Sequence, residues 1–360
     1  MDTALFDYHL PSERIAQEPA SLRDASKLLV VNRKDHSLQH RSFRDLPEFL
    51  GPNDFLFRNT AKVLPARLFA NRVTGGRVEC LLLRPGSEDG LSWWCLLKPG
   101  KKLPTGSTFS LEGVFRASVI AKNEEKAEYL VTFDLLTCSS VPELAEQCGK
   151  MPLPPYIRRE KEDSHDGEDT SRYQTTYAND DRMVAAAAPT AGLHFTPELT
   201  ELLRAQQVSF YDVVLHVGMG TFKPLEAERV EDHEIHREVY EVPVATQSAI
   251  RQAAAQGKRR VCVGTTSVRS IEDYLVKTND ITDQTFLGEA DIFIYPPRQF
   301  AGVDALITNF HLPKSTLLCL VSSFLTPGQP DGVKWLREIY EEAIRKEYRF
   351  LSYGDAMLIL

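Results

Sequence analysis

Residues 260–276 read RVCVGTTSVRSIEDYLV: a short apolar run, a polar turn and an amphipathic stretch. The run Arg260–Val263 predicts a buried strand, and Ser267–Val276 predicts a helix, because its apolar residues recur at helical spacing. A strand that leads directly into a helix is the repeating unit of α/β folds with a largely parallel sheet. This stretch therefore predicts the fold class.

The same alternation continues on both sides of this stretch. Thr196 and Pro197 have the character of an N-cap followed by a first-turn proline, which predicts a helix to about Gln207. Gly257 is a suitable C-cap for a helix that begins near Ala245. Further strands are predicted at Met183–Ala188, Val208–Val217 and Val303–Thr308, and further helices at Lys314–Phe324 and Gly332–Lys346.

Residues 64–133 have a different pattern, in which short apolar runs are separated by turn signals such as Thr74-Gly75-Gly76 and Pro99-Gly100. Turns about 8–12 residues apart predict a small antiparallel barrel or sandwich. We therefore expect a discontinuous α/β domain with a mostly parallel sheet, residues 1–62 and 155–360, and an inserted β-barrel domain, residues 63–154. Residues 159–171 are highly charged and are expected to form a mobile surface loop.

The composition is that of an ordinary soluble enzyme. No run of about 18 apolar residues predicts a membrane span, and the acidic N-terminus does not resemble a signal peptide, so we expect a cytoplasmic protein. The six cysteines are scattered, without a C-x-x-C pair or zinc spacing to histidine, which argues against a metal or iron–sulfur cofactor. The net charge of −8 argues against a nucleic-acid coat protein but not against an RNA enzyme, since RNA binding depends on a local basic face.

Three polar segments follow predicted strands, which is where ligands bind in open α/β sheets. They are residues 216–222 (HVGMGTF), 263–269 (VGTTSVR) and 308–315 (TNFHLPKS). Their glycines, hydroxyls and basic groups suit an anion or a ribose at a helix N-terminus. The structural alternatives are a tight turn for the first segment, an ordinary N-cap for the second and a capped turn for the third.

Other motifs are less informative. His233 and His236 form an H-x-x-H sequence, but it is not H-E-x-x-H and no third ligand is evident, so no metal site is expected. Without a Walker A sequence, a dinucleotide fingerprint or a nucleophile elbow, these residues alone indicate an α/β enzyme with a polar site.

Longer strings over nearly the whole chain resemble the S-adenosylmethionine:tRNA ribosyltransferase-isomerase family of queuosine biosynthesis. The longest are AAPTAGLHF at 187–195, GTTSVR at 264–269, ITNFHLPKS at 307–315 and YRFLSYGDAM at 348–357. Shorter ones include FDYHLP at 6–11, VLPARL at 63–68 and MPLPPYI at 151–157. The chain departs from the family pattern at several positions, where side chains with hydrogen-bonding groups are replaced or altered: Ala25, Thr60, Ala61, Val184, Ala185 and Ala290.

The resemblance implies an α/β domain with an inserted β-barrel. It also implies transfer and isomerisation of the ribosyl group of S-adenosylmethionine onto 7-aminomethyl-7-deazaguanine at the wobble position of tRNA with a GUN anticodon. The products would be epoxyqueuosine-tRNA, adenine and methionine. S-adenosylmethionine is then a co-substrate, no cofactor or metal is expected, and we expect a monomer without a membrane partner.

The matching strings also supply candidate site residues. The catalytic candidates are His194, His216, His311 and Asn309. The substrate-binding candidates are Gly218, Gly220, Thr265, Thr266, Ser267, Arg269 and Lys314, with Lys314 or Arg269 for the methionine carboxylate. The RNA-binding candidates are Arg67, Arg158 and Arg159. The alternative for the histidines is a role in bracing turns, and for the arginines an ion pair with the nearby acidic segment.

Two alternatives from other functional classes stay open. One is a nucleoside transferase that uses the same α/β site on a small molecule. The other is a non-catalytic or divergent RNA-binding member that uses only the barrel and local basic groups.

Overall fold

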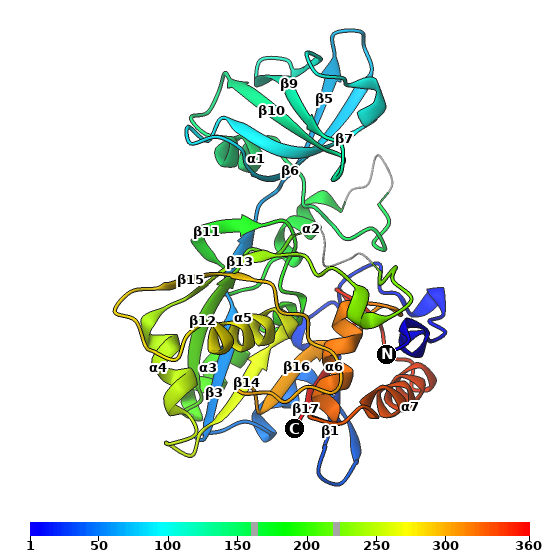
Figure 1. Cartoon of the computed structure of the whole chain (residues 1–360), viewed down its shortest axis with the longest axis vertical. Helices are drawn as coiled ribbons and strands as arrows, with labels where there is room; N and C mark the ends of the chain where they lie inside the picture. Colours follow the sequence, from blue (N-terminus) through cyan, green and yellow to red (C-terminus); the bar gives the residue numbers. More distant parts are fainter. Residues whose placement is uncertain (160–164, 219–223) are drawn as a thin grey trace.

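A nine-stranded mixed sheet forms the centre of the larger part of the molecule (Figure 1). The structure, a computed structural model, describes residues 1–159, 165–218 and 224–360. The strands lie in the order β15 (Phe286–Ala290), β13 (Glu238–Val242), β12 (Ser209–Leu215), β3 (Asp54–Asn59), β14 (Arg259–Val263), β16 (Ala305–Asn309), β17 (Ala356–Ile359), β1 (Lys27–Val31) and β2 (Leu38–Ser42). The central strands β12, β3, β14 and β16 are parallel, as are β1 and β17. Antiparallel pairs complete both edges.

Helices cover both faces of this sheet because successive strand residues point to opposite sides. Cys262 and Leu306 pack toward α4 (Val244–Gln252), α5 (Gly264–Lys277), α6 (Thr316–Leu325) and α7 (Gly332–Arg345). Their neighbours Val261 and Ile307 pack toward α3 (Pro197–Ala205) and the 3₁₀ helix η4 (Phe43–Glu48). Thr196 caps α3 as the sequence predicts, since its side chain accepts a hydrogen bond from the Leu199 amide. The other 3₁₀ helices among the described residues are η1 (Thr3–Phe6), η2 (Ser12–Arg14), η3 (Arg23–Ala25), η5 (Gly100–Lys102), η6 (Thr190–His194) and η8 (Val230–Asp232).

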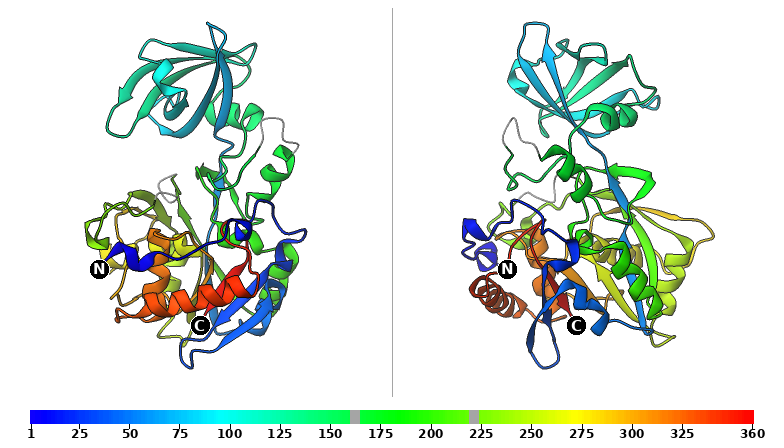
Figure 2. Two further views of the ribbon diagram at one scale, coloured as in Figure 1. Left: turned by 90° about the vertical axis from the view of Figure 1, so that its right-hand side faces the viewer. Right: turned by 180° about the vertical axis from the view of Figure 1, so that it is seen from behind.

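The second part of the molecule is a closed antiparallel barrel at one end of the molecule (Figures 1 and 2). Its strands follow the order β10 (Glu128–Leu135), β7 (Ser92–Lys98), β6 (Arg77–Pro85), β5 (Arg67–Arg72), β8 (Thr108–Leu111) and β9 (Phe115–Asn123). Its own core also includes Val141, Leu144 and Ala145 of α1 (Val141–Cys148). Between barrel and sheet, β4 (Ala61–Val63) pairs with β11 (Asn179–Ala185). The predicted α/β fold with an inserted barrel is therefore confirmed, while the boundaries at 62/63 and 154/155 stay a prediction.

Three local expectations are wrong. The helix expected from Ser267 begins at Gly264, so the GTTSVR string forms its first turns. The strand expected at Met183–Ala188 lies at Asn179–Ala185, where it pairs with β4. Of the predicted surface loop at 159–171, residues 160–164 lie outside the described residues, whereas most of the remainder belongs to a helix, α2 (Asp166–Arg172), in which Asp169 is buried with only 4% of its surface exposed. In the part of the chain that the structure describes, no helix is both long and apolar enough to cross a membrane.

Candidate active site

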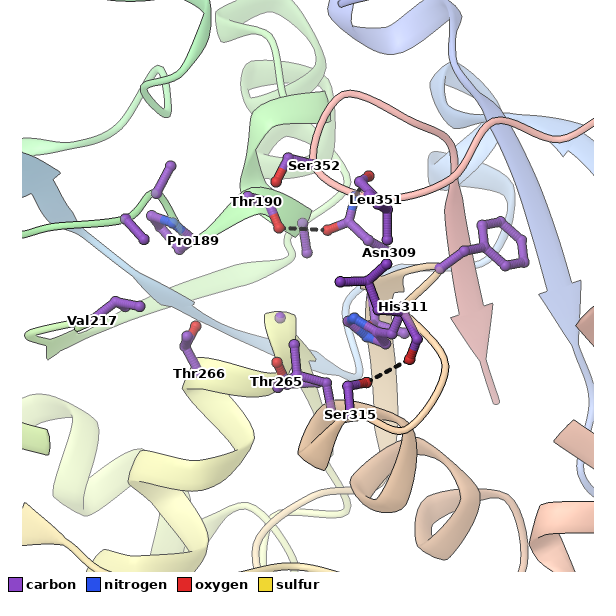
Figure 3. A pocket seen from close by; sticks show the side chains of 18 of the residues that line it. Pro189, Thr190, Val217, Thr265, Thr266, Asn309, His311, Ser315, Leu351 and Ser352 are labelled. Atoms are coloured by element: carbon purple, nitrogen blue, oxygen red, sulfur yellow. Dashed lines mark hydrogen bonds between the residues drawn. The ribbon is translucent and has the colours of Figure 1, made fainter. Parts of the chain in front are cut away.

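A cavity of about 230 Å³ lies at the carboxyl ends of β14 and β16 (Figure 3). Ligands are expected at this edge of an α/β sheet. Four segments form most of its described wall: the chain at and before η6, the start of α5, the turn that follows β16 and the turn that precedes β17; Tyr156, Val217 and Pro224 add to it. The lining residues that carry polar side chains are Tyr156, Thr190, Thr265, Thr266, Thr308, Asn309, His311, Ser315 and Ser352. Turns at the ends of strands that are far apart in the sequence thus surround the same cavity.

His311 is fixed in this wall by its backbone and by its ring. Its amide donates to the Tyr340 hydroxyl over 3.0 Å, and its carbonyl accepts a hydrogen bond from the Tyr8 hydroxyl. The ring Nε2 is 2.9 Å from the Thr308 hydroxyl, and 7% of the residue is exposed. Burial lowers the pKa of His311 to about 3, because the charged imidazolium loses its hydration. The imidazole is therefore neutral at pH 7.

Asn309 joins two walls of the cavity. Its Oδ1 accepts a hydrogen bond from the Thr190 hydroxyl over 2.9 Å (Figure 3). Its Nδ2 donates to the Leu351 carbonyl over 3.2 Å. Its own surface is 3% exposed. The amide therefore fixes η6 and the turn before β17 relative to β16.

The first turn of α5 supplies two threonines to the cavity wall. Gly264 has a φ of +86°, the left-handed conformation that glycine adopts without strain, and turns the chain from β14 into the helix. Thr265 and Thr266 then line the cavity. The Thr266 Oγ1 atom is buried and has no hydrogen-bond partner among the residues that the structure describes. Ser267 is fully buried instead, and its hydroxyl donates to the Val263 carbonyl over 2.8 Å.

A second cavity of about 50 Å³ shares Thr265 and Thr266 with the first. Arg269 lies in its wall beside Glu238. The Arg269 guanidinium forms an ion pair with the Glu238 carboxylate and donates to the carbonyls of His236, Ala290 (2.8 Å) and Ile292 (3.3 Å). These contacts make Arg269 a clamp between α5 and the edge strands. The Gly218 amide donates to Glu238 over 2.9 Å, whereas Gly220 lies outside the described residues.

Five of the predicted catalytic and substrate-binding residues are absent from the described lining of both cavities: Gly218 and Ser267, whose contacts are given above, and His194, His216 and Lys314. His194 is buried against Phe43, and its ring nitrogens lie 3.2 Å from the Ala191 carbonyl and 3.0 Å from the Gly354 carbonyl. Burial lowers its pKa. His216 lies at the end of β12 with Nε2 3.4 Å from Glu241, and burial lowers its pKa as well. Lys314 pairs with Asp7 at 3.0 Å on the surface.

The predicted RNA contacts occupy different environments. The Arg67 Nε donates to the Glu79 carboxylate over 2.6 Å on the barrel. The Arg159 guanidinium makes two hydrogen bonds to Asp169, at 2.7 and 2.8 Å. Arg158 is exposed. For Arg159, the geometry favours the alternative of an ion pair with the acidic segment.

Several lining residues were not predicted. Thr190, Leu351 and Ser352 lie in matching strings, but nothing in their local sequence marks them as facing a ligand. Tyr156 lies outside the polar segments, and burial raises its pKa to about 12. Within the described residues, no cluster of three or more His, Cys, Asp or Glu side chains is arranged to hold a metal ion.

Comparison with known proteins places this geometry in context. A family model described as "Queuosine biosynthesis protein" matches residues 3–359. A Thermotoga maritima protein named S-adenosylmethionine:tRNA ribosyltransferase-isomerase is 44% identical over 360 residues, which is 100% of each chain. A Pelobacter propionicus protein of the same name is 45% identical over 354 residues, 98% of each chain. A crystal structure of S-adenosylmethionine tRNA ribosyltransferase from Thermotoga maritima is 36% identical, with a TM-score of 0.54, and covers 99% of this chain and 100% of that one.

Proposed function

The chain belongs to the queuosine biosynthesis protein family of S-adenosylmethionine:tRNA ribosyltransferase-isomerases, and we propose that it acts on 7-aminomethyl-7-deazaguanine in tRNA. The position modified is the wobble base of tRNA with a GUN anticodon. The ribosyl group comes from S-adenosylmethionine, and the products are epoxyqueuosine-tRNA, adenine and methionine. We further propose that the chain works as a monomer in the cytoplasm, without a metal or another cofactor.

The observation that carries this proposal is the chemical character of the larger cavity. Among its described lining residues, none carries a carboxylate, an ammonium or a guanidinium group, and His311 is the one imidazole. Hydroxyls and backbone of η6, α5 and the turn after β16 surround a mainly apolar space. Ligand cavities that hold a nucleoside combine apolar walls with a few polar groups in this way.

The reaction needs proton transfers that such a site can supply. The positive sulfur of S-adenosylmethionine acidifies the hydrogens on C5′, so a base removes one of them. Adenine leaves with the electrons of its glycosidic bond and takes up a proton. The substrate amine forms a C–N bond to C1′ and releases a proton. The C1′–O4′ bond breaks, and the electron pair left on C5′ forms a C1′–C5′ bond that closes the carbocycle. O4′ then displaces sulfur from C5′, so the epoxide closes and methionine departs with the electrons of the C5′–S bond.

We assign these steps to residues of the cavity. We assign the proton transfer to His311, because it is the one imidazole among the described lining residues and a positioned acid or base contributes roughly 10²–10⁴-fold to the rate. The hydroxyls of Thr265 and Thr266 bind the ribose, and Asn309 fixes the walls around it. Arg269 is ion-paired with Glu238 in the wall of the second cavity and Lys314 with Asp7 at the surface, so both stay candidates for the methionine carboxylate, and each would exchange its present partner for it. His194 and His216 stay candidates for catalysis, although the contacts of His194 favour a bracing role.

The test is release of adenine. Purified protein is mixed with S-adenosylmethionine and tRNA that carries 7-aminomethyl-7-deazaguanine, and adenine is measured by chromatography. Adenine should form in proportion to the modified tRNA, and tRNA with guanine at the wobble position is the control. No adenine under any condition would refute the proposed activity and favour a non-catalytic RNA-binding protein.

The same assay separates the small-molecule alternative. Free 7-aminomethyl-7-deazaguanine replaces the modified tRNA at equal concentration. We expect little reaction, because the free base lacks the phosphate contacts that give tRNA binding its strong salt dependence. Equal rates with the free base would remove tRNA from the proposal.

A further inference from the structure

The outer surface of the barrel carries an aromatic ring surrounded by cations. Residues alternate along β5, so Leu68 and Ala70 point into the barrel core while Phe69 points outward and is partly buried. The Phe69 ring centre is 4.3 Å from the Arg77 guanidinium carbon, 5.6 Å from that of Arg67 and 5.8 Å from the Lys150 ammonium. We call these four residues the Phe69 patch.

The charges of this patch differ from those of the whole chain. The patch contains three cations, and two of them are ion-paired: Arg67 with Glu79, and Lys150 with Asp166. The chain as a whole has a net charge of −8, so a polyanion has to bind at a locally positive place. Ion pairs at exposed positions are weak, typically ~0–1 kcal/mol, so phosphates can replace these acids at little cost.

The patch is also connected to the active site. Lys150 is ion-paired with Asp166, the first residue of α2. In the same helix, Asp169 accepts a hydrogen bond from the Tyr353 hydroxyl over 2.8 Å. Tyr353 follows Ser352, which lines the larger cavity. One short helix therefore bridges the distance between the patch and the cavity wall.

We propose that the Phe69 patch is the docking surface for the anticodon loop of the tRNA substrate. Phe69 stacks on one unpaired base, and Arg77 and Lys150 bind the flanking phosphates. An aromatic ring within a group of basic side chains is the usual arrangement for binding single-stranded nucleic acid. This assignment rests on the proposed function only in taking tRNA as the substrate, and it adds Phe69, Arg77 and Lys150 to the RNA contacts expected from the sequence.

The test separates stacking from charge. Binding of an unmodified tRNA transcript with a GUN anticodon is measured by filter binding over a range of salt concentrations. Phe69→Leu keeps an apolar side chain and should weaken binding about tenfold, equivalent to about 1.4 kcal/mol, without changing the salt slope. Phe69→Trp should retain the wild-type affinity. Arg77→Ala should lower the slope of log K against log salt by roughly 0.7, as expected for one phosphate contact to a single strand.

A control cation lies on another strand of the barrel. Lys122 lies on β9, which is two places from β5 in the closed order of strands, and its ammonium lies 5.8 Å from the ring centre of Tyr129 on β10. Lys122→Ala should leave affinity and slope unchanged, and thermal melting checks that each variant is folded. The assignment is overturned if folded Phe69→Leu and Arg77→Ala bind tRNA as the wild type does, or if Lys122→Ala weakens binding as much as they do. Adenine release by the wild type would still support the proposed activity in either case. If the patch binds an acidic protein partner instead of RNA, both patch variants should bind tRNA as the wild type does.

Discussion

Replacing Arg159 by alanine should destabilise the protein without removing an RNA contact. The guanidinium donates to both carboxylate oxygens of Asp169, at 2.7 and 2.8 Å, and to the Gln17 carbonyl at 2.9 Å. The Asp169 side chain is 5% exposed and that of Arg159 14%. Removing one partner leaves the carboxylate of Asp169 buried without its counter-charge.

The size of the effect follows from this burial. Breaking a buried ion pair from one side costs about 3–5 kcal/mol, and we expect about 3 kcal/mol because the Tyr353 hydroxyl still donates to Asp169. The exposed neighbour Arg158 is the matched control, and Arg158→Ala should change the free energy of unfolding by less than about 0.5 kcal/mol. In the double variant with Asp169→Ala, the loss should be smaller than the sum of the two single losses.

Urea unfolding measures the stability, and filter binding at several salt concentrations measures the contact with tRNA. Arg159→Ala should lower the urea midpoint and leave the salt slope unchanged, whereas Arg158→Ala should lower the slope alone. An Arg159→Ala protein with the wild-type midpoint and a reduced salt slope would show that this guanidinium binds RNA and that the ion pair contributes little.

Three further predictions concern the cavity. His311→Ala should reduce adenine release by roughly 10²–10⁴-fold, whereas His194→Ala should lower the melting temperature and keep most of the turnover; the reverse pattern would move the site. The folded-state pKa of His311, about 3, lies below the unfolded value of about 6.5, so its contribution to stability is complete above pH 6.5 and is lost as the pH falls. Urea unfolding should therefore show a loss of about 2 kcal/mol between pH 7 and pH 5 that is missing in His311→Gln; equal losses in both proteins would contradict the burial argument. Thr266→Val removes a buried hydroxyl without a described partner, so it should raise the stability of the free protein by up to about 1 kcal/mol and raise the KM for S-adenosylmethionine about tenfold; a lower stability would show that the hydroxyl is already paired.

The sequence predicts most of the α/β fold because its signals are local. The apolar run at 260–263 and the cap at Thr196 act on neighbouring residues, and both appear in the structure as expected. Asp169 could not be predicted as buried in this way. Its partners Arg159 and Tyr353 are 10 and 184 residues away, so the charged segment has the composition of a loop although the folded chain makes part of it a helix.

The same reasoning explains which candidate residues lie together. Asn309 ends β16 and His311 follows it, so both lie in the cavity wall at the edge of the sheet where ligands are expected. His194 lies in an equally specific string, but its ring meets the carbonyl of Gly354, which is 160 residues away. Sequence position predicts that these residues lie near the edge of the sheet. The direction of each side chain, however, depends on contacts with residues far away in the sequence.

For α5, the expectation and the structure differ because the composition of the segment does not determine the residue at which the helix begins. A helix turns about 100° per residue, so Thr265 and Arg269 lie on nearly the same side, while Ser267 is rotated by about 200° from Thr265. A helix that begins at Gly264 places both threonines and Arg269 in the walls of the cavities. It also directs the hydroxyl of Ser267 inward, toward the Val263 carbonyl. A start at Ser267 would leave the threonines in a turn with no defined direction. Because Thr265, Thr266 and Ser267 are all good N-cap residues, their composition cannot distinguish the two starts. The positive φ of Gly264 does so, since it allows the chain to leave β14 and enter the helix at once.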